Sequence, residues 1–156
     1  MKILITGSNG LLGQKLVYKL RGNKTHTCIA TGRGANRLVK QDGYTYAELD
    51  ITNRASVKKV FEEFKPEVVI NTAAMTNVDA CETDRENCWL MNTTAVEYQV
   101  EVLNEMMLAD QSYKPHFIHL STDFIFDGTH GPLDENEKPN PLSYYAESKL
   151  AAENIV

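Results

Sequence analysis

The first twenty residues combine a short apolar run with three evenly spaced glycines and a helical apolar stripe. The run from Lys2 to Thr6 is of the buried-strand type, and Gly7, Gly10 and Gly13 follow it. The stripe consists of Leu12, Leu16, Val17 and Leu20. In the order strand, glycine turn, helix, bare backbone N–H groups lie at a helix N-terminus, where a pyrophosphate can approach them closely. The spacing G-x-x-G-x-x-G therefore predicts a dinucleotide site, although three glycines can also serve only as a tight turn.

The rest of the chain alternates strand and helix patterns. Strands are expected around residues 27–31, 44–48, 68–70 and 116–120. Helices are expected from a cap at Asn53 or Ser56 until Pro66, over about 85–109, and from Asn140 and Pro141 as cap and first position. A loop rich in glycine and proline spans 127–139. With right-handed crossovers, this order predicts a Rossmann-like doubly wound parallel sheet with helices on both faces, a three-layer α/β/α fold.

Composition limits the class of protein. The chain has 156 residues, 42% hydrophobic and 24% charged, which suits about one domain with a full core. A net charge of -5, with no basic cluster larger than Lys58-Lys59, argues against nucleic acid or an anionic membrane as a partner. No apolar run approaches the roughly 20 residues of a membrane span. The chain opens on a strand rather than a leader peptide, so the cytoplasm is the expected location.

The cysteines and histidines indicate neither a disulfide framework nor a metal centre. Three cysteines are an odd number, which fits reduced thiols. The histidines are His26, His116, His119 and His130. Because they lie apart without the spacing of metal ligands, no metal site is expected.

A tyrosine and a lysine near the end of the chain are the first catalytic candidates. Residues four apart share a helix face, so Lys149 is expected beside Tyr145, whereas Tyr144 faces Ser148. A lysine ammonium near a phenol lowers the pKa of the phenol, which makes it a proton donor usable near neutrality. Such pairs also arise by chance on amphipathic helices. The glycine turn at the other end of the chain predicts a dinucleotide site, and this supports a catalytic role for the pair.

The topology selects further site residues. In a doubly wound sheet, ligands gather beyond the carboxyl ends of the strands, where the strand order reverses. The residues that follow the later strands are Thr31-Gly32-Arg33, Asp50-Ile51, Asn71-Thr72-Ala73-Ala74 and Ser121-Thr122-Asp123. We expect them to form one site with the glycine turn, Tyr145 and Lys149.

Four stretches resemble the extended short-chain dehydrogenase/reductase family, and within it the dTDP-4-dehydrorhamnose reductase branch. They are residues 6–13 (TGSNGLLG), 71–82 (NTAAMTNVDACE), 121–128 (STDFIFDG) and 141–153 (PLSYYAESKLAAE). The first and last carry motifs of the whole superfamily, whereas the middle two point to the branch. The resemblance implies NADPH-dependent reduction of the 4-keto group of dTDP-4-dehydro-L-rhamnose, a nucleotide-linked deoxysugar, in polysaccharide biosynthesis. It also allows a homodimer.

The resemblance assigns roles to individual residues. Tyr145 would protonate the C4 carbonyl oxygen as hydride arrives, Lys149 would hold the nicotinamide ribose and lower the tyrosine pKa, and Thr122 would hydrogen-bond the carbonyl oxygen. Asn92 matches an asparagine that supports the site in the superfamily, and it equally suits a polar residue at a helix interface. The implied cofactor-binding residues are Gly7, Asn9, Gly10, Leu11, Leu12, Gly13, Arg33, Asp50, Ile51, Thr72, Ala73, Ala74, Tyr145 and Lys149.

Two departures from related enzymes carry information. Many NAD-using relatives have an acidic residue after the second strand, where this chain has Arg33. An arginine can pair with a 2′-phosphate, which favours NADPH and leaves NADH as the alternative cofactor. Related dehydratases carry a glutamate where this chain has Phe124. Phenylalanine cannot do the acid/base work of removing water, and a simple reduction does not need it.

Two alternative functions stay open, and so does the extent of the protein. The branch includes regulatory subunits that bind NADP without catalysis, and sugar-nucleotide epimerases share the cofactor site. The set Tyr145, Lys149 and Thr122 favours the enzyme, and Arg33 fits poorly an epimerase that holds NAD. The resemblance also implies that residues 1–156 are a cofactor-binding domain, and that a C-terminal substrate domain follows Val156.

Overall fold

The computed structural model describes all 156 residues, and its centre is one parallel sheet. The strands are β1 (Lys2–Thr6), β2 (Thr27–Gly32), β3 (Thr45–Glu48), β4 (Val68–Asn71) and β5 (His116–His119). They pair in the order β3-β2-β1-β4-β5, and every neighbouring pair is parallel. The predicted doubly wound topology is therefore confirmed, with the strand order reversing between β1 and β4.

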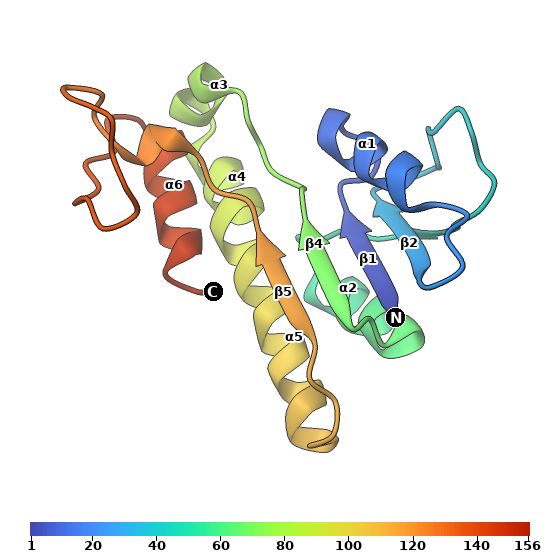
Figure 1. The fold of residues 1–156 in the computed structure, drawn as a ribbon. Coiled ribbons are helices and arrows are strands. Elements are labelled where there is room, and N and C mark those ends of the chain that lie inside the picture. Colours follow the sequence, from blue (N-terminus) through green and yellow to red (C-terminus); the bar gives the residue numbers. More distant parts are fainter.

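Helices cover both faces of the sheet (Figure 1). Helix α1 (Leu11–Leu20) packs on one face, where its Val17 joins Ile3 and Ile5 of β1 in a buried cluster. Helices α2 (Arg54–Phe64) and α5 (Ala95–Ala109) cover the other face, where Leu4 of β1 belongs to the main core. Alternate residues of β1 thus serve opposite faces, which explains why this strand reads as a continuous apolar run.

The long helix predicted over residues 85–109 contains a π-helical turn. Helix α4 (Arg85–Trp89) leads into the π turn η1 (Leu90–Thr94), which leads into α5. The π turn buries Asn92 and Thr93 against the last helix, α6 (Tyr144–Glu153). There Thr93 Oγ1 donates to the carbonyl oxygen of Ser148 at 2.9 Å. π turns inside α-helices are frequent at functional sites, and this one fixes α6 beside the carboxyl end of the sheet.

The start of α6 differs from the sequence prediction. The helix begins at Tyr144 because Ser143 caps it, with Ser143 Oγ accepting from the Ala146 N–H at 3.2 Å. The predicted cap, Asn140, is wrong because its backbone N–H donates to the carbonyl oxygen of Ile125 at 2.8 Å. That bond ties Asn140 into the preceding loop.

The other helix starts follow capping rules. Asn53 caps α2 by accepting from the Ser56 N–H at 3.1 Å, so the alternative cap at Ser56 is wrong. Helix α3 (Val78–Thr83) and the 3-10 turn η2 (Asp123–Ile125) were not predicted. Asn77 caps α3 in the same manner, by accepting from the Ala80 N–H at 2.9 Å. All three cysteines are free, and none of the helices has the length and apolar character needed to cross a bilayer.

Candidate cofactor and active site

The glycine turn lies at the carboxyl end of β1 and touches the segment that follows β4. Gly7 has a φ of 67°, in the left-handed region that favours glycine, and a Cβ there would lie 2.8 Å from the backbone of Ala73. Gly10 has an ordinary φ of -82°, and a Cβ there would meet only the Gly7 carbonyl oxygen, at 3.2 Å. Gly7 therefore shapes the turn itself, whereas Gly10 stands at the edge of open space.

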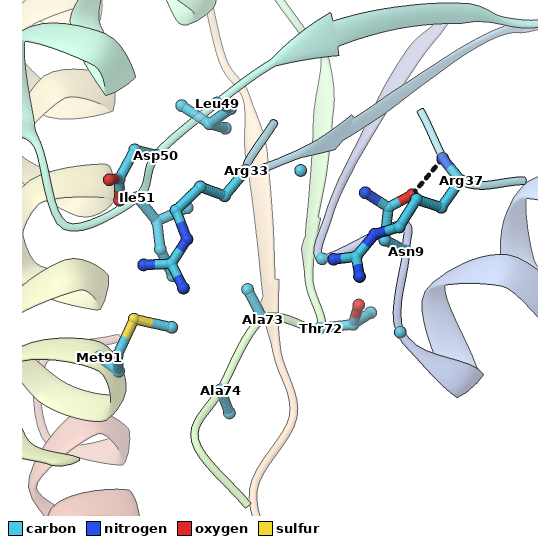
Figure 2. A pocket seen from close by; sticks show the side chains of 13 residues that line it. Asn9, Arg33, Arg37, Leu49, Asp50, Ile51, Thr72, Ala73, Ala74 and Met91 are labelled. Carbon is cyan, nitrogen blue, oxygen red and sulfur yellow. Dashed lines mark hydrogen bonds between the residues drawn. The ribbon is translucent and has the colours of Figure 1, made fainter. Parts of the chain in front are cut away.

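That open space is a pocket of about 290 Å³ built from the ends of β1 to β4 (Figure 2). Residues that the sequence predicted as cofactor ligands and that line it are Gly7, Asn9, Gly10, Arg33, Asp50, Ile51, Thr72, Ala73 and Ala74. The lining residues that were not among the predicted ligands are Gly32, Arg37, Leu49 and Met91. The strand-end rule had already selected Gly32 with Thr31 and Arg33, and it missed Leu49, which precedes Asp50, and the more distant Arg37 and Met91.

A second pocket, of about 360 Å³, adjoins the first. Gly10, Thr72, Ala73 and Ala74 line both pockets, so the two are parts of one elongated site. Predicted residues found only in the second pocket are Leu11, Leu12, Gly13, Tyr145 and Lys149. Asn71, Thr76, Leu120 and Ser121 complete its lining. The structure therefore brings every predicted cofactor residue to one of the two pockets.

Two arginines line the first pocket. Figure 2 shows Arg33 reaching from the end of β2 toward Met91, and Arg37 lying beside Asn9. The Oδ1 atom of Asn9 accepts from the backbone N–H of Arg37 at 2.9 Å. Neither guanidinium is paired with a carboxylate; the arginine ion pairs of the structure involve Arg21, Arg54 and Arg85. Two unpaired guanidinium groups facing one pocket suit a phosphate.

Tyr145 lies at the start of α6 and is buried, with 9% of its surface exposed. The ring of Phe124 meets it edge-on, with ring centroids 6.2 Å apart and planes at 87°. Burial raises the pKa of Tyr145, and a hydrogen bond from the Thr122 side chain opposes that rise. The neighbouring Tyr144 turns elsewhere, with its ring under the Arg85 guanidinium at 4.8 Å. The two tyrosines therefore have different surroundings, and of the two only Tyr145 lines the second pocket.

Lys149 shares the pocket with Tyr145 but its ammonium bonds other groups. It is 3% exposed, and its Nζ donates to the carbonyl oxygen of Leu120 at 2.5 Å and lies 3.0 Å from His119 Nε2. Burial lowers the pKa of Lys149 to about 8, against a smaller opposite effect of Glu153. The prediction that Lys149 lowers the pKa of Tyr145 is wrong for this structure, because burial dominates at the phenol and the ammonium is directed toward β5.

Thr122 and Asn92 both have structural partners. Thr122 caps the 3-10 turn η2, where its Oγ1 accepts from the Phe124 N–H at 3.2 Å. Asn92 accepts from the Met75 N–H at 2.8 Å, and its Nδ2 donates to the Met75 carbonyl oxygen and to Ser148 Oγ, each at 3.0 Å. Asn92 thus ties the segment after β4 to α6 and lines neither pocket. Its contacts with the site therefore run through α6 and through the segment after β4.

The side chains offer no ready metal site. No group of three or more histidine, cysteine, aspartate or glutamate side chains is placed to hold a metal ion. His119 faces Lys149 and Asn71, and the thiols of Cys81 and Cys88 are packed against Tyr145. Burial raises the pKa of the Cys81 thiol to about 12, so it stays protonated near neutrality.

Comparison with known proteins finds relatives that match the chain along its whole length. Residues 1–156 match the family described as the RmlD substrate binding domain. The structure of a dTDP-4-dehydrorhamnose reductase from Clostridium acetobutylicum ATCC 824 is 37% identical, has a TM-score of 0.80, and is matched over 100% of this chain and 49% of that one. A dTDP-4-dehydrorhamnose reductase from Bacillus anthracis str. Ames, in complex with NADP, is 27% identical, has a TM-score of 0.75, and is matched over 99% and 48%.

A further relative is named as a subunit of another enzyme rather than as a reductase. Methionine adenosyltransferase 2 subunit beta of Xenopus tropicalis is 32% identical over 155 residues, which are 99% of this chain and 42% of that protein. The chain spans about half the length of the curated relatives it matches.

Proposed function

The chain belongs to the RmlD substrate binding domain family, and from that membership we propose that it binds NADPH and serves the reduction of a nucleotide-linked 4-keto deoxysugar. The substrate we propose is dTDP-4-dehydro-L-rhamnose, reduced to dTDP-L-rhamnose. The membership agrees with the resemblance expected from four stretches of the sequence. Since the chain spans about half the length of its relatives, we assign residues 1–156 to the cofactor part and leave most sugar contacts to further residues.

The observation that carries the proposal is which side chains lie at the two ends of the elongated site. Unpaired Arg33 and Arg37 lie at one end, and Tyr145 and Lys149 lie at the other. NADPH has a 2′-phosphate at its adenosine end and the nicotinamide at its other end. Between them the glycine turn offers backbone N–H groups where a pyrophosphate would lie. The residues present therefore fit NADPH.

Each residue then has a defined task. Arg33 and Arg37 bind the 2′-phosphate, and Lys149 donates hydrogen bonds to the nicotinamide ribose. When bound, NADPH supplies the hydride. Tyr145 donates its hydroxyl proton to the C4 oxygen of the sugar, while Thr122 hydrogen-bonds the same oxygen. The raised pKa of Tyr145 keeps its phenol protonated near neutrality, which is the form that a proton donor requires.

A second candidate function has one specific observation in its favour. The relative from Xenopus tropicalis is named as a subunit of a methionine adenosyltransferase, and it matches this chain as well as some reductases do. A subunit that binds NADP without catalysis would keep the arginines and the glycine turn. We favour the reductase because Tyr145 and Lys149 line one pocket and Thr122, which lines neither pocket, is a side-chain partner of Tyr145.

Two measurements test the proposal. Calorimetric titration of the chain with NADPH and with NADH should show binding of both and tighter binding of NADPH. A version as long as its relatives should then oxidise NADPH, followed by absorbance, when dTDP-4-dehydro-L-rhamnose is added, and the same version carrying Tyr145→Phe is the control. Binding of NADPH without oxidation would favour the subunit. Absence of NADPH binding would contradict both functions.

A further inference from the structure

A row of polar side chains crosses the carboxyl end of the sheet and ends at Lys149. The strand register pairs Thr6 of β1 with Asn71 of β4, and Asn71 with His119 of β5. Residues in register on parallel neighbours project from the same face of the sheet. Here that face is covered by α5, whose Gln99 donates to Asn71 Oδ1 at 3.4 Å. The register alone therefore aligns the three side chains.

Hydrogen-bond distances connect the row from end to end. Thr6 Oγ1 lies 2.5 Å from Asn71 Oδ1, and Asn71 Nδ2 lies 3.1 Å from His119 Nδ1. On the other side of the imidazole ring, His119 Nε2 lies 3.0 Å from Lys149 Nζ. His119 is thus the one side chain that joins the lysine to the sheet. The cofactor role of Lys149 does not explain why the imidazole is there.

The charge on Lys149 determines which nitrogen of the His119 ring carries the proton. An ammonium has three N–H donors and no acceptor, so a charged Lys149 can bond His119 only if Nε2 carries no proton. Burial, and the ammonium itself, lower the pKa of His119 to about 4, so the ring is neutral at neutral pH. A neutral ring facing a charged lysine therefore carries its proton on Nδ1, and Asn71 must turn its Oδ1 atom toward that proton.

The opposite proton arrangement also satisfies the contact between His119 and Lys149. If Lys149 is a neutral amine, its lone pair accepts from an Nε2–H, and His119 Nδ1 then accepts from Asn71 Nδ2. This second arrangement corresponds to the amide orientation in the structure, with Nδ2 toward the ring. An amide has nearly the same shape in both orientations, so Asn71 can serve either one by a flip. The flip puts Nδ2 where Oδ1 now accepts from Thr6 Oγ1 and Gln99 Nε2, so the Thr6 hydroxyl must then accept and the 3.4 Å bond from Gln99 is given up.

We propose that His119 is a positioning residue for Lys149, and that its ring tautomer changes with the charge on the lysine. The ring holds the ammonium between β5 and the pocket, and Asn71 supplies whichever atom the tautomer needs. The importance of this pair for turnover rests on the proposed function, in which Lys149 holds the ribose. The contact itself does not depend on that function.

The titratable groups around the pair are few. Lys149 faces His119 from β5, and from its own helix it is near Glu153, which favours the charged lysine, and Tyr145 in the shared pocket. For His119 the charged neighbour is Lys149. Asn71 and Gln99, from β4 and α5, are neutral. A change of the His119 tautomer near pH 8 is therefore attributable to Lys149.

The experiment is a nuclear magnetic resonance titration of the chain labelled with 15N at histidine and at lysine. In the wild type, the His119 ring should change from Nδ1–H to Nε2–H without gaining charge, with the same midpoint as the Lys149 Nζ titration. In His119→Leu the lysine midpoint should fall by about one pH unit, because the ammonium loses an acceptor. In His119→Gln the midpoint should return to within a few tenths of the wild type, since the glutamine Oε1 atom can accept.

The matched control is His116→Leu, an exposed histidine at the start of the same strand, which should leave the Lys149 midpoint unchanged. An Nε2–H tautomer that persists while Lys149 is charged would overturn the proposal, and so would equal lysine midpoints in wild type and His119→Leu. The wild-type tautomer decides the matter even if a variant does not fold. A separate NADPH titration tests the proposed function, so failure of one idea is distinguishable from failure of the other.

Discussion

A Cβ atom on Gly13 would lie 2.3 Å from the carbonyl oxygen of Gly7. Gly13 is in the first turn of α1, so the helix and the turn before it approach each other at a point where no side chain fits. We expect Gly13→Ala to destabilise the fold by about 1–3 kcal/mol, the usual cost of overpacking. Urea unfolding measures this change. Gly10→Ala is the control and should cost much less, because a Cβ at Gly10 meets one atom at 3.2 Å.

The second prediction concerns cofactor binding and uses Gly10. Gly10→Val should abolish NADPH binding, since its branched side chain would occupy the edge shared by the two pockets. The fold should survive, because Gly10 has an ordinary φ of -82°. Calorimetry gives the binding and a melting curve gives the stability. Normal binding by a well-folded Gly10→Val protein would show that the turn has only a structural role.

The fold was predictable because its signals are local and repeated. β1 and the glycine turn are adjacent in sequence, and right-handed crossovers leave few ways to arrange alternating strands and helices. The start of α6 was not predictable, because Asn140-Pro141 is as good a helix start as Ser143 until the bond from Asn140 to Ile125 is known. The π turn has no local signal either, since its stabilising partner, Ser148, is more than fifty residues away.

The third prediction tests how the first pocket selects its cofactor. Arg33→Ala and Arg37→Ala should each weaken NADPH binding about tenfold or more, since a charge-assisted hydrogen bond to phosphate is lost. NADH binding should change much less, because NADH has no 2′-phosphate. Arg85→Ala, whose guanidinium lies over Tyr144 rather than in the pocket, is the matched control. Equal weakening of both cofactors by Arg33→Ala would refute the assignment of the 2′-phosphate site.

Part of the site could be read from the sequence because it consists of strand ends. Arg33 follows β2 directly and was predicted, whereas Arg37 lies in irregular chain and reaches the pocket through the Asn9 bond to its backbone. Met91 enters the same pocket from the π turn. The pKa of Tyr145 was mispredicted for a different reason. Helical spacing placed Lys149 near it but could not show that β5 offers the ammonium better acceptors.

The fourth prediction is a pH dependence of stability. The pKa of His119 is about 4 in the folded chain, because of burial and of the Lys149 ammonium, and near the ordinary histidine value of 6.5 when unfolded. Between these values the unfolded state binds more protons, so stability is full above pH 6.5 and is lost as the pH falls toward 4. The full shift corresponds to about 3 kcal/mol, and solvent screening of the half-buried ring reduces the loss attributable to His119 below that value. Urea unfolding at several pH values should show a shallower acid slope in His119→Gln. Parallel slopes in the two proteins would contradict the shift.

The last prediction separates the adjacent tyrosines in a version as long as the relatives. Tyr145→Phe removes the proposed proton donor and keeps the ring that packs edge-on against Phe124. Turnover should therefore fall by roughly 10² to 10⁴, the usual contribution of positioned acid catalysis, while NADPH affinity barely changes. Tyr144→Phe is the matched control and should have a small effect, because its ring lies against Arg85 and Trp89 outside both pockets.

Lys149→Met is compared with the two tyrosine variants and should lower both NADPH affinity and turnover. It removes the ribose contact, so NADPH affinity falls, and turnover falls with it. The reduced turnover of Lys149→Met should recover in part at saturating NADPH, whereas that of Tyr145→Phe should not, because only Tyr145 is assigned the proton. Steady-state kinetics over a range of NADPH concentrations distinguish the two patterns. If Tyr145→Phe keeps near-normal turnover, or Tyr144→Phe is the inactive variant, the proton donor is not Tyr145 and the case for a reductase rests on the cofactor pocket alone.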